Sequence, residues 1–262
     1  MRIKKISKLN SGEYLVEVEL EKGTKEYKLS EDALIENGWY SNQELSPESY
    51  QNLIHLANYS RLYSQVLNYL SFKMRTIKEV EDYITSKGCQ NQDQKRIIEK
   101  LIKLNYLNDE RYTESFIKQQ FELNKKGPLW IKGQLIKKGI KDSLIDTKLN
   151  VLKETDIHKM IAKIIATYEK LNKTKTEQKL KESILRNLIS KGFSYEDSIY
   201  SLNTYSFDVN IDEEKLVKKE LEKAIKRYSK KYEGYELKSR AIKALMAKGY
   251  RYELVEGLYE ED

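Results

Sequence analysis

The sequence has few of the residues that carry catalysis, cross-linking or metal binding. Cys89 is its single cysteine, which excludes a disulfide framework and a cysteine-based metal site. His55 and His158 are its two histidines, and we find no acid–base or metal partner spaced on the same predicted helix as either. Neither a Gly-rich phosphate loop nor a Gly-flanked nucleophilic serine occurs. We therefore predict no enzyme activity, no cofactor and no metal.

Proline and long apolar runs are also scarce. Two prolines and eleven glycines interrupt 262 residues, which favours long helices. No stretch approaches the roughly 18 apolar residues of a membrane span, and the N-terminus MRIKKISKLN lacks the apolar core of a signal peptide. We therefore expect a cytoplasmic protein without membrane contact. With 39% hydrophobic and 34% charged residues, a thin array of small helical units is favoured over one thick globule.

The first thirty residues have the alternation of a half-buried sheet. Apolar side chains occupy every second position of residues 14–20, residues 21–24 supply a turn, and residues 26–29 can return as the partner strand. Ile3 and Ile6 fit a third strand. A small β-rich module is therefore predicted at the start of the chain.

The rest of the chain carries an internal repeat of a helical unit. Lys-Gly pairs end at Gly88, Gly139, Gly192 and Gly249, separated by 51, 53 and 57 residues. Apolar residues stand eight and four residues before each glycine and one residue after it, as one helix face requires when glycine closes the helix. The residues four positions before are Ile84, Leu135, Leu188 and Leu245. The repeat predicts that these four are buried and that helices end near the glycines.

Capping residues place the helices. Ser30 can cap a short helix that ends at Gly38, and Ser46-Pro47 marks the start of the next. In the first repeat, the predicted helix starts are Thr76, Asn91 or Asp93, and Asp109. Each unit is therefore expected to be trihelical, resembling a helix-turn-helix.

We predict a mostly α fold: tandem trihelical repeats in an elongated curved array behind the β-rich module. The predicted ranges are 1–58 for the β-rich N-terminal module, 59–124, 125–175 and 176–233 for trihelical repeats 1 to 3, and 234–262 for a partial fourth repeat.

The net charge of +7 is unevenly distributed. Residues 1–60 carry a net charge of −3, whereas residues 123–175 hold thirteen bases and five acids, a net charge of +8. One interpretation is a solvated lysine face that only aids solubility, and the other is a surface for phosphates or for an acidic protein. The candidate partner-binding or nucleic-acid-binding residues are Lys125, Lys126, Trp130, Lys132, Lys137, Lys138 and Lys141.

Helical geometry predicts where Trp130 lies. On a helix that starts at Pro128, with about 100° per residue, one side carries Pro128, Leu129, Ile131, Leu135 and Ile136. Trp130 falls on the opposite side beside Lys137, so we expect an exposed ring among lysines. Such a ring can stack on a base while lysines hold phosphates. The alternative is that Trp130 covers the core of a neighbouring unit.

Three stretches resemble the RecX family. Residues 66–80 resemble its short apolar helix leading into R-[ST]-x-x-E-[LV], and residues 104–112 its element that ends in Y-[IL]-[ND]-D-x-x-[FY]. Residues 126–140 resemble its G-P-x-x-I-x-x-[EQ]-L-x-x-K-G-[IV] element. The three elements come in family order, and the similarity covers about residues 1–200.

This resemblance implies a regulator of RecA recombinase filaments on single-stranded DNA, which damps recombinase ATPase, strand exchange and coprotease activity. Its expected partners are the filament and single-stranded DNA, with weaker binding to double strands, and its expected state is a monomer. DNA repair, recombination and the SOS response are the implied processes. A helix-turn-helix transcription regulator and a general nucleic-acid-binding protein are the alternatives. Against the former, no unit combines a clearly base-reading helix with an obvious dimerisation element.

Overall fold

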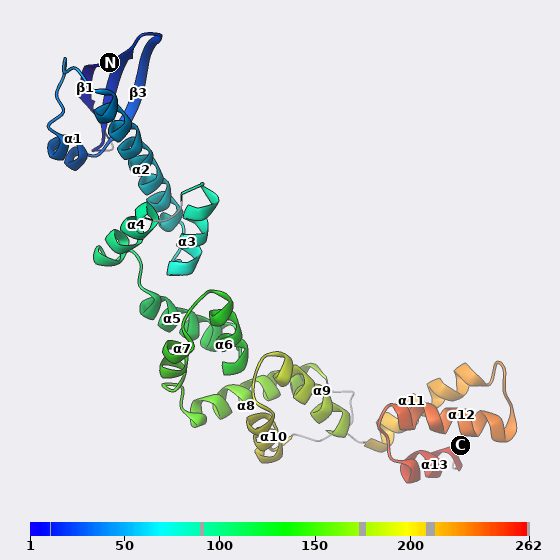
Figure 1. Ribbon diagram of the computed structural model, residues 1–262. Coiled ribbons are helices and arrows are strands. Elements are labelled where there is room, and N and C mark those ends of the chain that lie inside the picture. The colour runs from blue at the N-terminus through cyan, green and yellow to red at the C-terminus, as the bar shows by residue number, and fades with distance from the viewer. Residues whose placement is uncertain (11, 90–91, 173–176, 208–212, 261–262) are drawn as a thin grey trace. The chain divides into compact units, whose positions relative to one another are not determined.

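The chain folds into helices behind a small sheet, as Figure 1 shows for a computed structural model. The described residues are 1–10, 12–89, 92–172, 177–207 and 213–260. Within these ranges there are thirteen α-helices, one π-helix and one three-stranded sheet. The predicted fold class, mostly α with a β-rich start, is confirmed.

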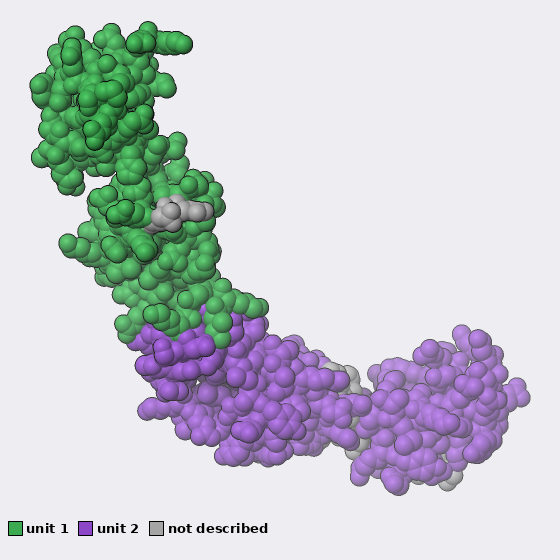
Figure 2. All heavy atoms as spheres, in the orientation of Figure 1, with its two compact units in different colours: residues 1–113, 136–141 green, residues 114–135, 142–262 purple. Residues whose placement is uncertain are grey.

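The chain divides into two compact units (Figure 2). The first comprises residues 1–113 with 136–141, and the second residues 114–135 with 142–262. In the part of the chain that is described, no helix combines the length and the apolar character needed to cross a membrane.

The N-terminal sheet is antiparallel, and its strands follow one another along the chain and across the sheet. They are β1 (Arg2–Lys8), β2 (Tyr14–Leu20) and β3 (Gly23–Leu29). Val16 and Val18 are fully buried on β2, which confirms the predicted alternation. β1 is the predicted third strand, with Ile3 opposite Val18 and Ile6 opposite Val16.

Helices α1 (Glu31–Asn37) and α2 (Pro47–Ser71) follow the sheet and start as predicted. The Ser30 and Ser46 hydroxyls accept hydrogen bonds from backbone N–H groups three residues on, which satisfies donors at each helix start. The first half of α2 packs on the sheet core through Leu53 and Ala57. Its second half packs on the next core through Leu62 and Val66. One helix therefore serves two cores.

Two short helices complete that second core. They are α3 (Ile77–Ser86) and α4 (Gln92–Lys103), followed by α5 (Asp109–Lys118) and the π-helix η1 (Gln119–Leu123). Val80 and Ile84 of α3 meet Ile97 and Leu101 of α4 in the interior. Thr76 caps α3 as predicted, in a reciprocal capping box with Glu79. Two alternative caps were predicted for α4. Asp93 is not the cap, because it lies inside the helix, and Asn91 lies outside the described residues.

The predicted cap of α5 is wrong by one residue. Asn108, not Asp109, precedes the helix, and its side-chain oxygen accepts from the Arg111 N–H at 2.9 Å. Asp109 is instead the first helical residue, and its carboxylate accepts the Ile77 N–H at 2.9 Å. Asp109 therefore accepts a hydrogen bond from the distant Ile77 N–H instead of from an N–H of its own helix, and it joins α5 to the start of α3.

The remaining helices continue without strands in the described residues. They are α6 (Pro128–Lys137), α7 (Asp142–Leu149), α8 (Glu154–Leu171), α9 (Glu177–Ser190), α10 (Tyr195–Thr204), α11 (Glu213–Tyr228), α12 (Gly234–Ala247) and α13 (Tyr252–Glu260). Side chains from α11, α12 and α13, among them Val217, Leu245 and Val255, share one core. The domain ranges given above stay a prediction.

The four repeat glycines end helices as predicted. Helices α3, α6, α9 and α12 each stop two residues before their glycine, which has a φ of 80–86°. Residues other than glycine adopt this left-handed conformation only at a cost in free energy. The four apolar residues predicted to be buried, Ile84, Leu135, Leu188 and Leu245, are 0% exposed. The repeat inferred from spacing is therefore confirmed.

Two glycine substitutions should separate backbone strain from steric overlap. Gly88→Ala meets no atom within 4 Å, so we expect it to cost about 1–2 kcal/mol through its left-handed φ alone. Gly139→Ala adds overlap with Lys78 Cβ and Cγ and should cost more. Urea titration with backbone circular dichroism measures both losses, and equal losses would contradict the overlap argument.

Candidate nucleic-acid interface

Helix α6 carries the predicted interface and begins where two glycines meet. The Gly127 N–H donates to the Lys191 carbonyl at 2.8 Å, and the Leu129 N–H donates to the Gly192 carbonyl at 3.0 Å. A Cβ on Gly127 would overlap the Gly192 backbone, and a Cβ on Gly192 would overlap Trp130. Pro128, between these donors, has no N–H to satisfy. The end of α9 is therefore held against the start of α6 through bare backbone.

The apolar side of α6 is narrower than predicted. Ile131 and Leu135 are fully buried, but Leu129 is 61% exposed and Ile136 is 46% exposed. The prediction that the latter two belong to the buried side is wrong. The buried stripe of α6 is therefore the pair Ile131 and Leu135, which lie one turn apart.

Trp130 is half-buried, so the prediction of an exposed ring is wrong as well. Its Cβ and backbone lie against Gly192, at the end of α9. The alternative that Trp130 covers the core of a neighbouring unit stays a prediction. The Lys126 Nζ stands 4.8 Å from the centre of the ring, within the range of a cation–π contact. Trp130 therefore contacts the end of α9 through its backbone and Cβ, and Lys126 through its ring.

Two of the predicted lysines are occupied by internal ion pairs. Lys132 Nζ lies 2.5 Å from Asp146 Oδ1, and this hydrogen bond raises the pKa of Lys132. Lys138 Nζ lies 2.8 Å from Glu79 Oε1. Burial lowers the pKa of Lys138, but hydrogen bonds to Glu79 and Tyr112 outweigh it and raise the pKa. Both lysines thus have much of their charge neutralised within the chain.

The other four predicted lysines have no acidic partner within 4 Å among the described residues. Lys137 and Lys141 are exposed, whereas Lys125 and Lys126 are half-buried. Lys125 has a φ of 52°, a left-handed conformation that is uncommon outside glycine. Lys125 and Lys126 belong to the second unit and Lys137 and Lys141 to the first.

Lys191 is a basic residue that the sequence argument did not place in the site. Burial lowers its pKa, and the positive charges of Lys126 and Lys125 lower the pKa further. The signal that could have found it is the Lys-Gly pair that marks each repeat. Three lysines therefore approach one another where α9 meets α6.

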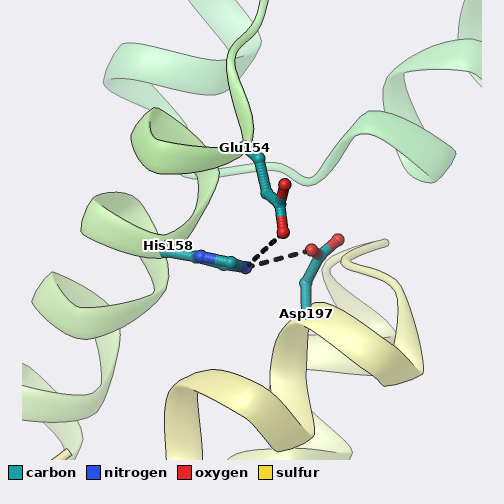
Figure 3. Close-up of side chains that lie close together, drawn as sticks. All are labelled: Glu154, His158 and Asp197. Carbon is teal, nitrogen blue, oxygen red and sulfur yellow. Dashed lines mark hydrogen bonds and ion pairs between the residues drawn. The ribbon is translucent and has the colours of Figure 1, made fainter. Parts of the chain in front are cut away.

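The histidines have partners that the sequence did not reveal. His158 Nε2 lies 3.2 Å from Asp197 Oδ1 on α10 and 3.9 Å from Glu154 Oε1, four residues earlier on α8 (Figure 3). His55 Nε2 lies 2.8 Å from Asp93 Oδ2. The expectation that neither histidine has a partner on its own helix is wrong for His158, because Glu154 is one turn away.

Glu154, His158 and Asp197 offer ligand atoms within 4.8 Å of one another, a set that could hold a divalent transition metal. Helix capping accounts for the position of Asp197 without a metal. The Ser194 hydroxyl donates to Asp197 Oδ2 at 2.5 Å and accepts the Asp197 N–H, which leaves Oδ1 for His158. The cluster thus joins α8 to the start of α10.

Comparison with known proteins places the chain among proteins built from tandem three-helix domains, and it identifies the family. Models of the RecX first and second three-helix domains match residues 63–101 and 108–149. A protein named Regulatory protein RecX from Streptococcus uberis is 34% identical over 98% of this chain and 99% of its own length. Its namesake from Lactococcus lactis is 37% identical over 86% and 85%.

Solved structures agree with these matches. A crystal structure of RecX from Lactobacillus salivarius is 31% identical, covers 55% of this chain and 94% of its own, and has a TM-score of 0.52. A second, titled as regulatory protein RecX, is 22% identical with a TM-score of 0.64 over 77% of this chain and 98% of its own, which supports the fold. The chain belongs to the RecX family of regulatory proteins.

The Glu79–Lys138 pair should make stability depend on pH. Burial would raise the pKa of Glu79, but hydrogen bonds from Lys138 and from the Thr76 backbone lower it below its ordinary value. A lowered folded-state pKa gives stability that is present above the unfolded value, about 4.3, and is lost as pH falls further. Lys138→Met should therefore destabilise the protein at pH 7 and shrink the loss between pH 7 and pH 3.5, measured by urea titration.

The exposed Lys137 supplies the control for this experiment, because it has no acidic partner within 4 Å among the described residues. Lys137→Met should leave the difference between the two pH values unchanged. An unaltered difference in Lys138→Met would contradict the pairing argument.

Proposed function

We propose that this chain binds RecA-type recombinase filaments on single-stranded DNA and modulates them, with inhibition as the expected direction. The observation that carries the proposal is similarity over nearly the full length to proteins named Regulatory protein RecX. The chain would act as a cytoplasmic monomer, without catalysis or cofactor, in recombination, DNA repair and the SOS response.

The charges of the structure support a ranking of the proposed contact residues. Lys125, Lys126, Lys137 and Lys141 have no internal acidic partner within 4 Å in the described ranges, so their ammonium groups are available to phosphates or to acidic side chains. Lys132 and Lys138 would first have to leave Asp146 and Glu79. Trp130 offers a partly exposed ring beside Lys126. We therefore propose the four unpaired lysines and Trp130 as the main contacts, and the two paired lysines as lesser ones.

Sedimentation with recombinase tests the proposed function. We expect the purified chain to pellet with filaments assembled on single-stranded DNA more than with recombinase or DNA alone, and to lower filament ATPase activity. Equal retention on bare DNA and on filaments would favour a general nucleic-acid-binding protein instead. Binding to one duplex sequence only would favour a transcription regulator.

Replacing both histidines tests the absence of catalysis. His55→Gln with His158→Gln should leave inhibition of the filament nearly intact, because neither residue lies among the proposed contacts. A small loss of thermal stability is expected, since His158 would no longer bond Asp197 in the same geometry. Loss of regulation in a variant that remains folded would contradict the non-enzymatic proposal.

A further inference from the structure

The repeat builds the same type of junction three times. In each, a left-handed glycine lies against the first turn of the preceding repeat's marked helix: Gly139 against Lys78, Gly192 against Trp130 and Gly249 against Lys179. The first two junctions also share their backbone register. The Lys138 carbonyl accepts the Thr76 hydroxyl at 2.8 Å, and the Lys191 carbonyl accepts the Gly127 N–H at 2.8 Å. Thr76 and Gly127 both stand twelve residues before their own repeat glycine.

The lysine before the glycine is neutralised in two of these junctions. Lys138 lies 2.8 Å from Glu79, and Lys248 lies 2.5 Å from Glu220. Lys191 has no carboxylate within 4 Å among the described residues. The position nine residues before the repeat glycine explains the difference between the first two junctions, because it holds Glu79 in the first and Trp130 in the second.

In the middle junction, further lysines take the place of an acid. The Gly127 N–H bonds the Lys191 carbonyl, which brings the preceding Lys125 and Lys126 to the same junction. Their positive charges act on Lys191, whose pKa is lowered by burial and then by this repulsion. The backbone contact of Gly127 with Gly192 holds the segments together against the repulsion. Like charges held in this way attract an anion.

We infer that Lys125, Lys126 and Lys191 form a phosphate-binding site for the backbone of single-stranded nucleic acid, beside the half-buried ring of Trp130. The inference rests on the proposed function, in which such a strand runs within the filament, and adds Lys191 as a contact. Compact ammonium groups suit a phosphate, because each offers three rotatable donors. The indole supplies a ring on which a base can stack.

Salt titration of a fluorescent 20-nucleotide oligothymidylate tests the site without recombinase. Lys191→Gln should lower affinity roughly tenfold, as expected for loss of a hydrogen bond between charged groups. It should flatten the log–log salt dependence by about 0.7, the value for one phosphate contact on a single strand. Lys125→Gln with Lys126→Gln should flatten it at least as much.

Lys248→Gln is the matched control. It removes one lysine at the same place of another repeat, where Glu220 already neutralises the charge, so affinity and slope should stay unchanged. Circular dichroism and the unfolding midpoint verify that every variant is folded. If Lys191→Gln behaves like Lys248→Gln, or if the unmodified chain does not bind the oligonucleotide, the phosphate site is overturned.

The filament sedimentation above separates this inference from the proposed function. If Lys191→Gln loses filament binding while its oligonucleotide affinity is unchanged, the lysines contact an acidic protein surface, and only the phosphate site is wrong. If the unmodified chain ignores filaments but binds the oligonucleotide through Lys191, the phosphate site stands and the recombinase proposal fails.

Discussion

Direct contact between the backbones of Gly127 and Gly192 is the constraint on which the centre of the molecule depends. Hydrogen bonds from Gly127 and Leu129 to the end of α9 require the two segments to approach without side chains between them. This approach leaves Trp130 only half exposed and brings Lys191 toward Lys125 and Lys126. Gly192, which ends α9, therefore also decides which charges meet at this junction.

Local features of the sequence predicted the fold well, because they are local in the structure too. The glycine turns, the Ser30, Ser46 and Thr76 caps and the alternation of β2 involve residues within a few positions of one another. Asp109 was placed wrongly because its carboxylate bonds Ile77, 32 residues earlier, rather than its own helix start. Periodicity identifies which residues share one side of a helix, but it does not show which of them a distant segment will cover. Leu129 and Ile136 share a side with Ile131 and are nevertheless exposed.

The candidate site was harder to predict, because net charge counts lysines without their partners. Lys138 is paired with Glu79, 59 residues earlier, and His158 with Asp197, 39 residues later. Nothing in a composition count distinguishes Lys138 from Lys191, although Lys138 is neutralised by Glu79 and Lys191 faces further lysines. Aligning the repeats on their glycines does distinguish them, since it sets Trp130 opposite Glu79. Comparing the repeats position by position therefore gives information about the ion-pair partners of lysines that a charge count does not contain.

Helix α2 has a consequence for how the N-terminal part of the chain can vary. Leu53 and Ala57 belong to the sheet core, and Leu62 and Val66 to the helical core, on one uninterrupted helix of 25 residues. Adding or removing one residue between these pairs would turn one set of side chains by about 100° relative to the other. Only changes near whole numbers of turns keep both sets in phase. The length of this segment is therefore limited by the rotation of side chains around the helix axis and not by the distance between the two cores. Insertions of about seven or eleven residues, which are close to whole numbers of turns, are the ones it can accommodate.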